Sequence, residues 1–354
     1  MAAHEVRDQR VAGLDGIVLV SHECDLSVAF VPGAGMVGCS LTHRGEELLG
    51  QRGGLAAYRE RGSTFGIPLL HPWANRLAGM SYSAGGHEVE LDAERSPVHL
   101  DPNGLPIHGV LAASPYWEIV GRSPGNGRAA VAARLDFAAH KELMEAFPFP
   151  HELHVQAELV GDTVTVATIL LPTGGVAVPI SFGWHPYLRL PGVPRADWRV
   201  ELPVRRRALL DERGLPTGET EAVTIEAAAL GGRTYDDHFV GLDGPTVFAL
   251  EGGGRRIEVE LGQGYPFTQV YAPVGGDEEP YVCFEPMTAP VNALASGESL
   301  DFVPPGASRD PGSTTRTSRW RQSASTATSS SSTRPSATSS ATRKRSSPRR
   351  PGRR

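Results

Sequence analysis

The chain has few of the features that mark secreted, membrane-bound or metal-dependent proteins. No run of about eighteen apolar residues occurs, so we expect no transmembrane helix. The N-terminus, MAAHEVRDQRVAGLDG, lacks a basic region followed by an apolar stretch, which argues against a signal peptide. The three cysteines, Cys24, Cys39 and Cys283, are far apart, which argues against a disulfide framework. We therefore expect reduced thiols in a cytoplasmic protein.

Zinc-binding spacings of Cys and His, a GxGxxG phosphate loop and internal repeats are also missing. Lysine is nearly absent. The net charge of −6 hides an asymmetry: residues 305–354 carry eleven Arg and one Lys against one Asp (+11), and residues 1–304 carry 22 basic and 39 acidic side chains (−17). The negative net charge of residues 1–304 disfavours binding to nucleic acid, so we expect neither a nucleic-acid nor a membrane partner for this part of the chain.

Alternation of apolar and polar residues, which is typical of β-strands, is abundant in the sequence. Residues 151–171 alternate apolar and polar positions on either side of Gly161-Asp162, which predicts an antiparallel hairpin. Further strands are expected at 129–137, 256–261, 268–271 and 281–284, and short helices at His140–Ala146 and Glu226–Leu230. High Gly and Pro content (41 and 29 residues) agrees with many short strands joined by turns. Residues 1–304 are therefore predicted to form one all-β, antiparallel sandwich domain.

From Pro305 onward the sequence is rich in Ser, Thr, Arg and Pro, and Trp320 is its single aromatic residue. Such a segment buries too little apolar area to offset its ordering entropy, so we predict that residues 305–354 are disordered. Two interpretations stand. Residues from about Ala307 are a frameshifted or miscalled terminus, which would leave the sandwich one strand short. Alternatively, they are a genuine basic tail for acidic partners.

Four short segments rich in Gly, Pro and Trp carry polar groups of a kind that a rigid scaffold presents to a ligand. They contain Arg76, His108, His185 and Glu285. Trp184 and Tyr187 flank His185 and offer a wall on which a sugar ring could stack. The segment HPWANRLAG also holds Asn75, and His71 there is interpreted as structural.

Two further polar positions are candidates. In Thr234-Tyr235-Asp236-Asp237-His238, either carboxylate could accept sugar hydroxyl protons, and spacing alone does not choose between Asp236 and Asp237. Gln269 alternates with apolar neighbours on a predicted strand. Ring opening of a cyclic aldose needs a base for the anomeric hydroxyl and an acid for the ring oxygen. A glutamate and a histidine can supply both without a metal or organic cofactor.

The segments FGIPLLHPWANRLAG, PIHGVL, SFGWHPYLRLPG, TYDDHFVGL, FTQVYAP and VCFEPMTAPVNAL resemble, in order, the motifs of the aldose 1-epimerases, or mutarotases. The resemblance covers residues 15 to 304. It implies a galactose mutarotase-like β-supersandwich with an open sugar cleft, and cofactor-free interconversion of α and β anomers.

The resemblance also implies residue roles. Glu285 matches the general base and His185 the general acid. The substrate-binding positions fall on Arg76, His108, Asp237 and Gln269, with Asn75 and Trp184 in the same motifs. His71-Pro72-Trp73 departs from the Gly-Arg-Tyr of typical galactose mutarotases, so the preferred sugar is left open, as is the oligomeric state.

Three alternatives remain at this point. A hexose-6-phosphate epimerase would need a phosphate clamp, for which Arg59 and Arg61 are candidates. A glycoside hydrolase would need Glu285 and Asp237 at a set separation. A sugar-binding module without catalysis would leave the presence of both catalytic residues unexplained.

Overall fold

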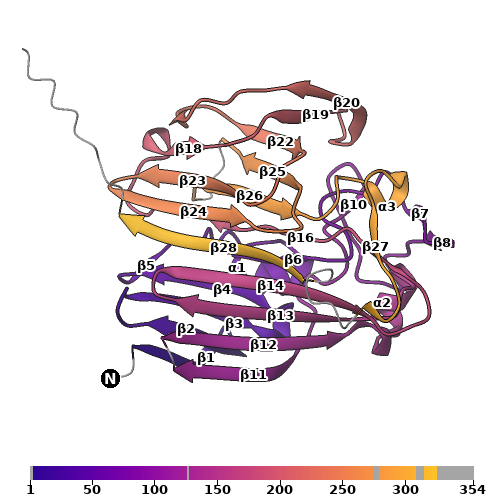
Figure 1. Ribbon diagram of the computed structural model, residues 1–354, viewed down its shortest axis with the longest axis horizontal. Coiled ribbons are helices and arrows are strands. Elements are labelled where there is room, and N and C mark those ends of the chain that lie inside the picture. Colours follow the sequence, from indigo (N-terminus) through magenta and orange to yellow (C-terminus); the bar gives the residue numbers. More distant parts are fainter. Residues whose placement is uncertain (1–2, 126, 275–278, 308–314, 325–354) are drawn as a thin grey trace, which may run out of the picture.

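The computed structural model describes residues 3–125, 127–274, 279–307 and 315–324. Within them the chain forms two layers of antiparallel sheet (Figure 1). The front layer is a nine-stranded sheet, in the order β11 (Glu118–Gly125), β12 (Arg128–Asp136), β13 (His151–Val160), β14 (Thr163–Pro172), β28 (Thr315–Ala324), β24 (Arg255–Leu261), β23 (Thr246–Gly252), β18 (Arg199–Glu201) and β21 (Ala228–Ala229).

The second layer comprises two sheets. One is eight-stranded: β20 (Pro216–Ala222), β19 (Arg206–Leu210), β22 (Tyr235–Val240), β25 (Phe267–Ala272), β26 (Val282–Met287), β16 (Gly183–Trp184) and β6 (Leu69–Leu70), with β17 (Tyr187–Leu188) also pairing with β26. The other is five-stranded: β1 (His4–Val11), β2 (Leu14–Ser21), β3 (Leu26–Val31), β4 (Val37–His43) and β5 (Glu46–Glu47).

The remaining elements are short. The two-stranded ribbons are β7 (Ser81–Ala84) with β8 (His87–Glu90), β9 (His99–Leu100) with β10 (Pro106–Ile107), and β15 (Val178–Ile180) with β27 (Asp301–Val303). The α-helices are α1 (Gly54–Arg61), α2 (Lys141–Ala146) and α3 (Ala293–Ser296). Among the described helices, none has the length and apolar character needed to cross a membrane.

One continuous apolar core lies between the layers. Phe248 of β23 packs on Phe284 of β26 with ring centroids 5.5 Å apart, and Trp184 of β16 donates a hydrogen bond to Thr168 of β14. Strands β12, β13 and β14 alternate buried and half-exposed residues along their lengths, as one-sided burial requires. The predicted hairpin is confirmed, with Gly161 and Asp162 at its turn. The all-β antiparallel sandwich is confirmed with it.

The two predicted short helices have different outcomes. The helix at His140–Ala146 is confirmed as α2, which begins one residue later. The helix at Glu226–Leu230 is wrong, because Ala228 and Ala229 form β21 and pair with Val200 and Arg199. A five-residue alanine-rich stretch cannot nucleate a helix by itself, so an open sheet edge determines its conformation.

The prediction of disorder beyond residue 305 is wrong for Thr315–Ala324. These residues form β28, which pairs with β14 on one side and β24 on the other, so the sheet is not one strand short (Figure 1). The physical reason is that β14 and β24 each present a row of backbone donors and acceptors, and any extended segment without proline satisfies them. The rest of the predicted disordered tail lies largely outside the described residues.

Candidate active site

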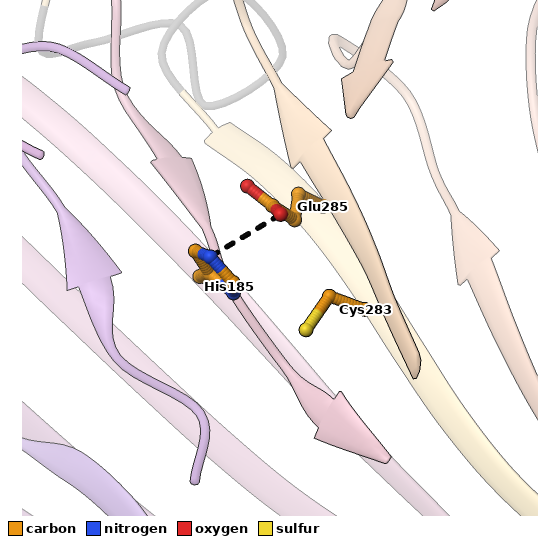
Figure 2. A group of neighbouring side chains, drawn as sticks. All are labelled: His185, Cys283 and Glu285. Carbon is orange, nitrogen blue, oxygen red and sulfur yellow. Dashed lines mark ion pairs between the residues drawn. The ribbon is translucent and has the colours of Figure 1, made fainter. Parts of the chain in front are cut away.

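Glu285 and His185 meet on the face of the eight-stranded sheet that points away from the core. Glu285 lies within β26, and His185 follows β16, the neighbouring strand. His185 Nε2 lies 3.2 Å from Glu285 Oε1, and the side chains are 6% and 2% exposed (Figure 2). Neighbouring strands therefore hold an acid–base pair in direct contact and shielded from water.

Aromatic and basic groups hold His185 in place. Its ring stacks on Tyr187, with centroids 4.4 Å apart and an angle of 4° between the planes. The Tyr187 hydroxyl in turn lies 2.6 Å from the Thr64 hydroxyl and accepts a hydrogen bond from Arg52. The His108 ring lies near that of His185, with centroids 5.2 Å apart and an angle of 80° between the planes. The His185 ring is therefore packed against two neighbouring rings, with its Nε2 beside Glu285 Oε1.

Burial opposes charge on both members of the pair. It raises the pKa of Glu285 well above its ordinary value, helped by Asp236 and opposed by Arg76. It lowers the pKa of His185 well below its ordinary value, and His108 and Arg52 add to this effect. The pKa of His108 is lowered to about 3 by burial and by Arg76. Without substrate, the pair therefore holds one proton and no net charge, with Glu285 protonated and His185 neutral.

Several buried polar atoms around this pair have no hydrogen-bond partner among the described residues. They are Glu285 Oε2, Gln269 Oε1, His185 Nδ1 and His108 Nδ1. Gln269 lies on β25 directly opposite Glu285, and its amide nitrogen donates to Asp236. Unpaired buried polar atoms are costly unless a ligand satisfies them. These atoms are therefore groups near the Glu285–His185 pair that a polar ligand could satisfy.

Arg76 is positioned by an aspartate that our sequence interpretation missed. Its Nε donates to Asp101 Oδ2 at 2.7 Å, and the Asp101 side chain is 1% exposed. Burial alone would raise the pKa of Asp101. Hydrogen bonds from Arg76 and from the Leu105 and Asn103 amides outweigh it and leave that pKa below its ordinary value. Arg76 is therefore a paired, permanently charged donor at the edge of the site.

A sequence signal for Asp101 did exist. Asp101-Pro102-Asn103-Gly104-Leu105-Pro106 and Asp211-Glu212-Arg213-Gly214-Leu215-Pro216 share the pattern D-x-x-G-L-P. In both turns the aspartate accepts hydrogen bonds from the amides two and four residues later. Their leucines pack in one cluster with Leu70, and the Arg76 guanidinium lies against Gly214. The repeated turn thus flanks Arg76 on two sides.

The two adjacent aspartates of β22 are separated by the sheet. Asp236 accepts the hydrogen bond from Gln269 at 2.7 Å, beside Glu285. Asp237 points to the opposite face, where Arg207 donates to it at 2.7 Å. Asp236 is therefore the aspartate on the Glu285 side of the sheet, and Asp237 faces away from it. The resemblance favoured Asp237, but the side of a strand on which a residue lies depends on register, which the motif does not contain.

Trp184 and Asn75 also differ from expectation. The Trp184 side chain is fully buried in the core, so the aromatic ring beside His185 is that of Tyr187. Asn75 has a left-handed backbone (φ 58°), and its carbonyl accepts the His108 amide while its side chain accepts from Arg76. Asn75 therefore shapes the loop that holds His108 and Arg76. His71 is structural, as predicted, and its Nε2 lies 2.9 Å from His151 Nε2 in the core.

A thiol completes the cluster. Ligand atoms of His185, Cys283 and Glu285 all lie within 4.8 Å of one another, a set that could hold a metal ion (Figure 2). Burial, and then Glu285, raise the pKa of the Cys283 thiol well above its ordinary value. A metal ion here would occupy both Glu285 and His185, so neither side chain could then transfer a proton to or from a ligand. Cys24, Cys39 and Cys283 are free.

Comparison with known proteins bears on the family and the fold of this chain. The family model described as aldose 1-epimerase matches residues 17–310. An uncharacterised protein of Escherichia coli, YihR, is 25% identical over 254 residues, which cover 68% of this chain and 77% of that protein. A galactose mutarotase-like protein from Clostridium acetobutylicum superposes with a TM-score of 0.74 at 18% identity, covering 91% of this chain and 98% of the other. A putative aldose 1-epimerase from Escherichia coli gives 0.63 at 19% identity, covering 91% and 99%.

Proposed function

This chain belongs to the aldose 1-epimerase family, and we propose that it is a mutarotase that interconverts the α and β anomers of a free aldohexose. The observation that carries the proposal is the buried contact between Glu285 and His185, surrounded by polar atoms that lack partners. Glu285 is the general base, His185 the general acid, and Arg76, His108, Asp236 and Gln269 bind the sugar.

The reaction uses the single proton that the pair holds. With that proton on His185, the Glu285 carboxylate accepts the proton of the C1 hydroxyl while His185 donates to the ring oxygen. The bond between C1 and the ring oxygen breaks and an aldehyde forms. Rotation about the C1–C2 bond presents the other carbonyl face. Glu285 then returns its proton to the C1 oxygen as His185 removes the proton from the attacking hydroxyl, and the ring closes.

Burial of the pair favours the open-chain intermediate. After ring opening, Glu285 is protonated and His185 is neutral, which is the state that burial stabilises for both groups. The same burial makes the charged pair reactive, because proton transfer removes two charges from a poorly solvated site. The site thus assists the formation of the aldehyde, the high-energy species of mutarotation.

The described structure favours a free sugar over a phosphorylated one. Arg59 and Arg61, the candidate phosphate clamp, are exposed on α1, and Arg61 pairs with Glu60 at the surface. The hydrolase alternative paired Glu285 with Asp237, which lies on the other face of the sheet with Arg207. Asp236 does lie on the Glu285 side, but the group in contact with Glu285 is His185, which a mechanism based on two carboxylates does not use. Mutarotation requires a base and an acid that reach the same ring, and the contact between Glu285 and His185 supports this assignment.

Polarimetry tests the proposal. Fresh α-D-glucose, α-D-galactose and their 6-phosphates are followed with and without the protein, against the spontaneous rate. We expect faster mutarotation of a free aldose, unchanged by EDTA and slowed by added Zn²⁺. Glu285→Gln keeps shape and removes basicity, so the rate should fall by about 10²–10⁴. Wild-type protein that accelerates none of these sugars, or a Glu285→Gln variant within a few-fold of wild type, would remove the proposed role.

A further inference from the structure

Strand register brings three buried side chains of different chemistry together beside the proposed catalytic contact. Cys283 and Glu285 are two residues apart on β26, so their side chains project from the same face of that strand. The strands β16 and β17, which flank His185, pair with β26 in one register, and that register puts His185 opposite Glu285. A thiol, a carboxylate and an imidazole therefore meet on one side of the sheet (Figure 2).

The separations between the ligand atoms suit a tetrahedral metal ion. The Cys283 sulfur, a His185 nitrogen and a Glu285 oxygen all lie within 4.8 Å of one another, and His185 Nε2 is 3.2 Å from Glu285 Oε1. The bond lengths of zinc sites place neighbouring ligand atoms about 3.3–3.6 Å apart. The nitrogen and the oxygen are already close to this separation, so a small rotation of the Cys283 side chain is the adjustment that a bound ion requires.

The donor atoms indicate which kind of cation fits. Thiolate and imidazole are ligands that Zn²⁺ prefers, whereas Mg²⁺ and Ca²⁺ prefer sites built of oxygen atoms. Three protein ligands leave a fourth tetrahedral position for water. Glu285 Oε2 has no hydrogen-bond partner among the described residues, so the carboxylate has a buried oxygen that a cation satisfies.

Burial and charge favour the same kind of ion. Cys283 is 0% exposed, Glu285 2% and His185 5%. A thiolate and a carboxylate carry two negative charges between them, and one divalent cation cancels both. A buried site tolerates such a neutral complex far better than it tolerates an unbalanced charge.

We propose that Cys283, His185 and Glu285 form a binding site for one thiophilic divalent cation such as Zn²⁺, and that this cation and the sugar exclude each other. The metal site stands on the geometry of the three side chains, whereas the mutual exclusion rests on the proposed mutarotase function. Bound Zn²⁺ holds the carboxylate and the imidazole that proton transfer to and from the sugar requires. The cation is therefore a reversible inhibitor that competes with the sugar.

Absorption spectroscopy with Co²⁺ tests the site without any need for activity. Co²⁺ binds in tetrahedral zinc sites, and a thiolate ligand gives it a charge-transfer band in the near ultraviolet. Protein treated with EDTA and then desalted is titrated with Co²⁺. We expect the band to saturate at one Co²⁺ per chain, to disappear when Zn²⁺ is added, and to be absent from Cys283→Ser.

Cys24→Ser is the matched control, because it removes a free thiol that is more exposed than Cys283 and lies elsewhere in the chain. Its Co²⁺ band should equal that of wild type. Thermal unfolding shows whether each variant folds. If Cys283→Ser does not fold, Glu285→Gln replaces it and should weaken Co²⁺ binding by about tenfold or more.

Mutarotation rates at several concentrations of sugar and Zn²⁺ test the mutual exclusion. We expect Zn²⁺ to raise the apparent KM and to leave kcat unchanged, and Mg²⁺ at the same concentration to have no effect. Cys283→Ser should raise the inhibition constant of Zn²⁺ by about tenfold or more, with kcat/KM within a few-fold of wild type, because the proposed reaction uses no thiol. Added sugar should also weaken Co²⁺ binding, as read from the band.

The outcomes separate the metal site from the mutarotase function. Wild-type protein without a thiolate band, an equal band in Cys283→Ser, or a band lost in Cys24→Ser overturns the metal site. Zn²⁺ that lowers kcat at unchanged KM, or Co²⁺ binding that the sugar does not weaken, overturns the exclusion. A band that depends on Cys283 in a protein that accelerates the mutarotation of no sugar overturns the mutarotase function and leaves the metal site in place.

Discussion

Asp236 and Asp237 are neighbours in the chain, yet they serve opposite faces of β22. Asp236 accepts from Gln269 beside Glu285, and Asp237 is bound by Arg207 on the far side of the sheet. At the scale of single residues, function thus depends on which face a side chain occupies. The same alternation puts His185 in the site and the adjacent Trp184 in the core.

Asp236→Asn and Asp237→Asn form a matched pair of isosteric variants. Asp236→Asn removes a charged acceptor from the site, and we expect a loss of about ten- to a hundredfold in kcat/KM, the equivalent of one charge-assisted hydrogen bond. Asp237→Asn should stay within about twofold of wild type while weakening the Arg207 pair at the surface. Steady-state polarimetry measures both. Equal losses in the two variants, or a larger loss for Asp237→Asn, would reverse the assignment.

The dependence of kcat/KM on pH should report the protonation of the Glu285–His185 pair. The active state holds one proton on the pair, so kcat/KM should fall in acid, when both groups are protonated, and in alkali, when both have lost their protons. Burial places the acid limb well below the ordinary pKa of histidine and the alkaline limb well above that of glutamate.

Asp236 raises the pKa of Glu285, so Asp236→Asn should move the alkaline limb to lower pH, whereas Asp237→Asn should leave it in place. Initial mutarotation rates, corrected for the spontaneous reaction at each pH, give the profile. An alkaline limb that does not respond to Asp236→Asn would show that Glu285 is not the group titrating there.

At the scale of elements, the site depends on turns as much as on strands. Asn75 and His108 both have left-handed backbones, and the His108 amide donates to the Asn75 carbonyl. The turn at Asp101 holds Arg76 from one side, and the turn at Asp211 packs Gly214 against it from the other. Left-handed conformations in residues other than glycine cost free energy and occur where surrounding contacts enforce them.

Asp101→Asn tests this support directly. The amide oxygen can still accept the Asn103 and Leu105 amides, so the turn persists, but the charge that orients Arg76 is lost. We expect KM to rise by roughly tenfold with a smaller change in kcat, because the role proposed for Arg76 is to bind the sugar and not to transfer a proton. Asp211→Asn, the equivalent change in the second turn, touches no ion pair to Arg76 and should change KM less. A fall confined to kcat would contradict a positioning role.

At the scale of the whole molecule, the sandwich depends on a strand from the basic C-terminal segment. β28 separates β14 from β24, and its register sets Ser318 opposite Val166 and Leu261, and Gln322 opposite Ile257. The partner residues of these polar positions are buried. Pairing of backbone groups, which is independent of side-chain type, places this segment in the sheet.

Truncation measures what that strand contributes. A chain ending at Ala307 leaves β14 and β24 with unpaired edges, so we expect lower solubility and a lower midpoint of thermal unfolding than in the full chain. A chain ending at Ala324 keeps β28 and should match the full chain in both measurements. Resequencing the locus tests the frameshift interpretation separately, and an in-frame gene rejects it. Equal behaviour of all three chains would show that β28 adds nothing to the fold.

The sequence alone determined the all-β sandwich, and its resemblance to a family supplied most of the candidate site residues. Alternation of apolar and polar residues has a period of two in strands, so the hairpin of β13 and β14 could be located to within a residue. Motif order likewise gave Glu285, His185, His108, Arg76 and Gln269 as candidate site residues. These are local patterns, written in a few consecutive positions.

Only the tertiary structure decided the features that depend on strands and turns far apart in the chain. Register between β22, β25 and β26 selects Asp236 over Asp237, and a turn 25 residues after Arg76 supplies Asp101. The edges of β14 and β24 bring a Ser- and Arg-rich segment into the sheet. Backbone pairing and burial act through space, so a local pattern such as D-x-x-G-L-P can indicate a turn but not the side chain that the turn contacts.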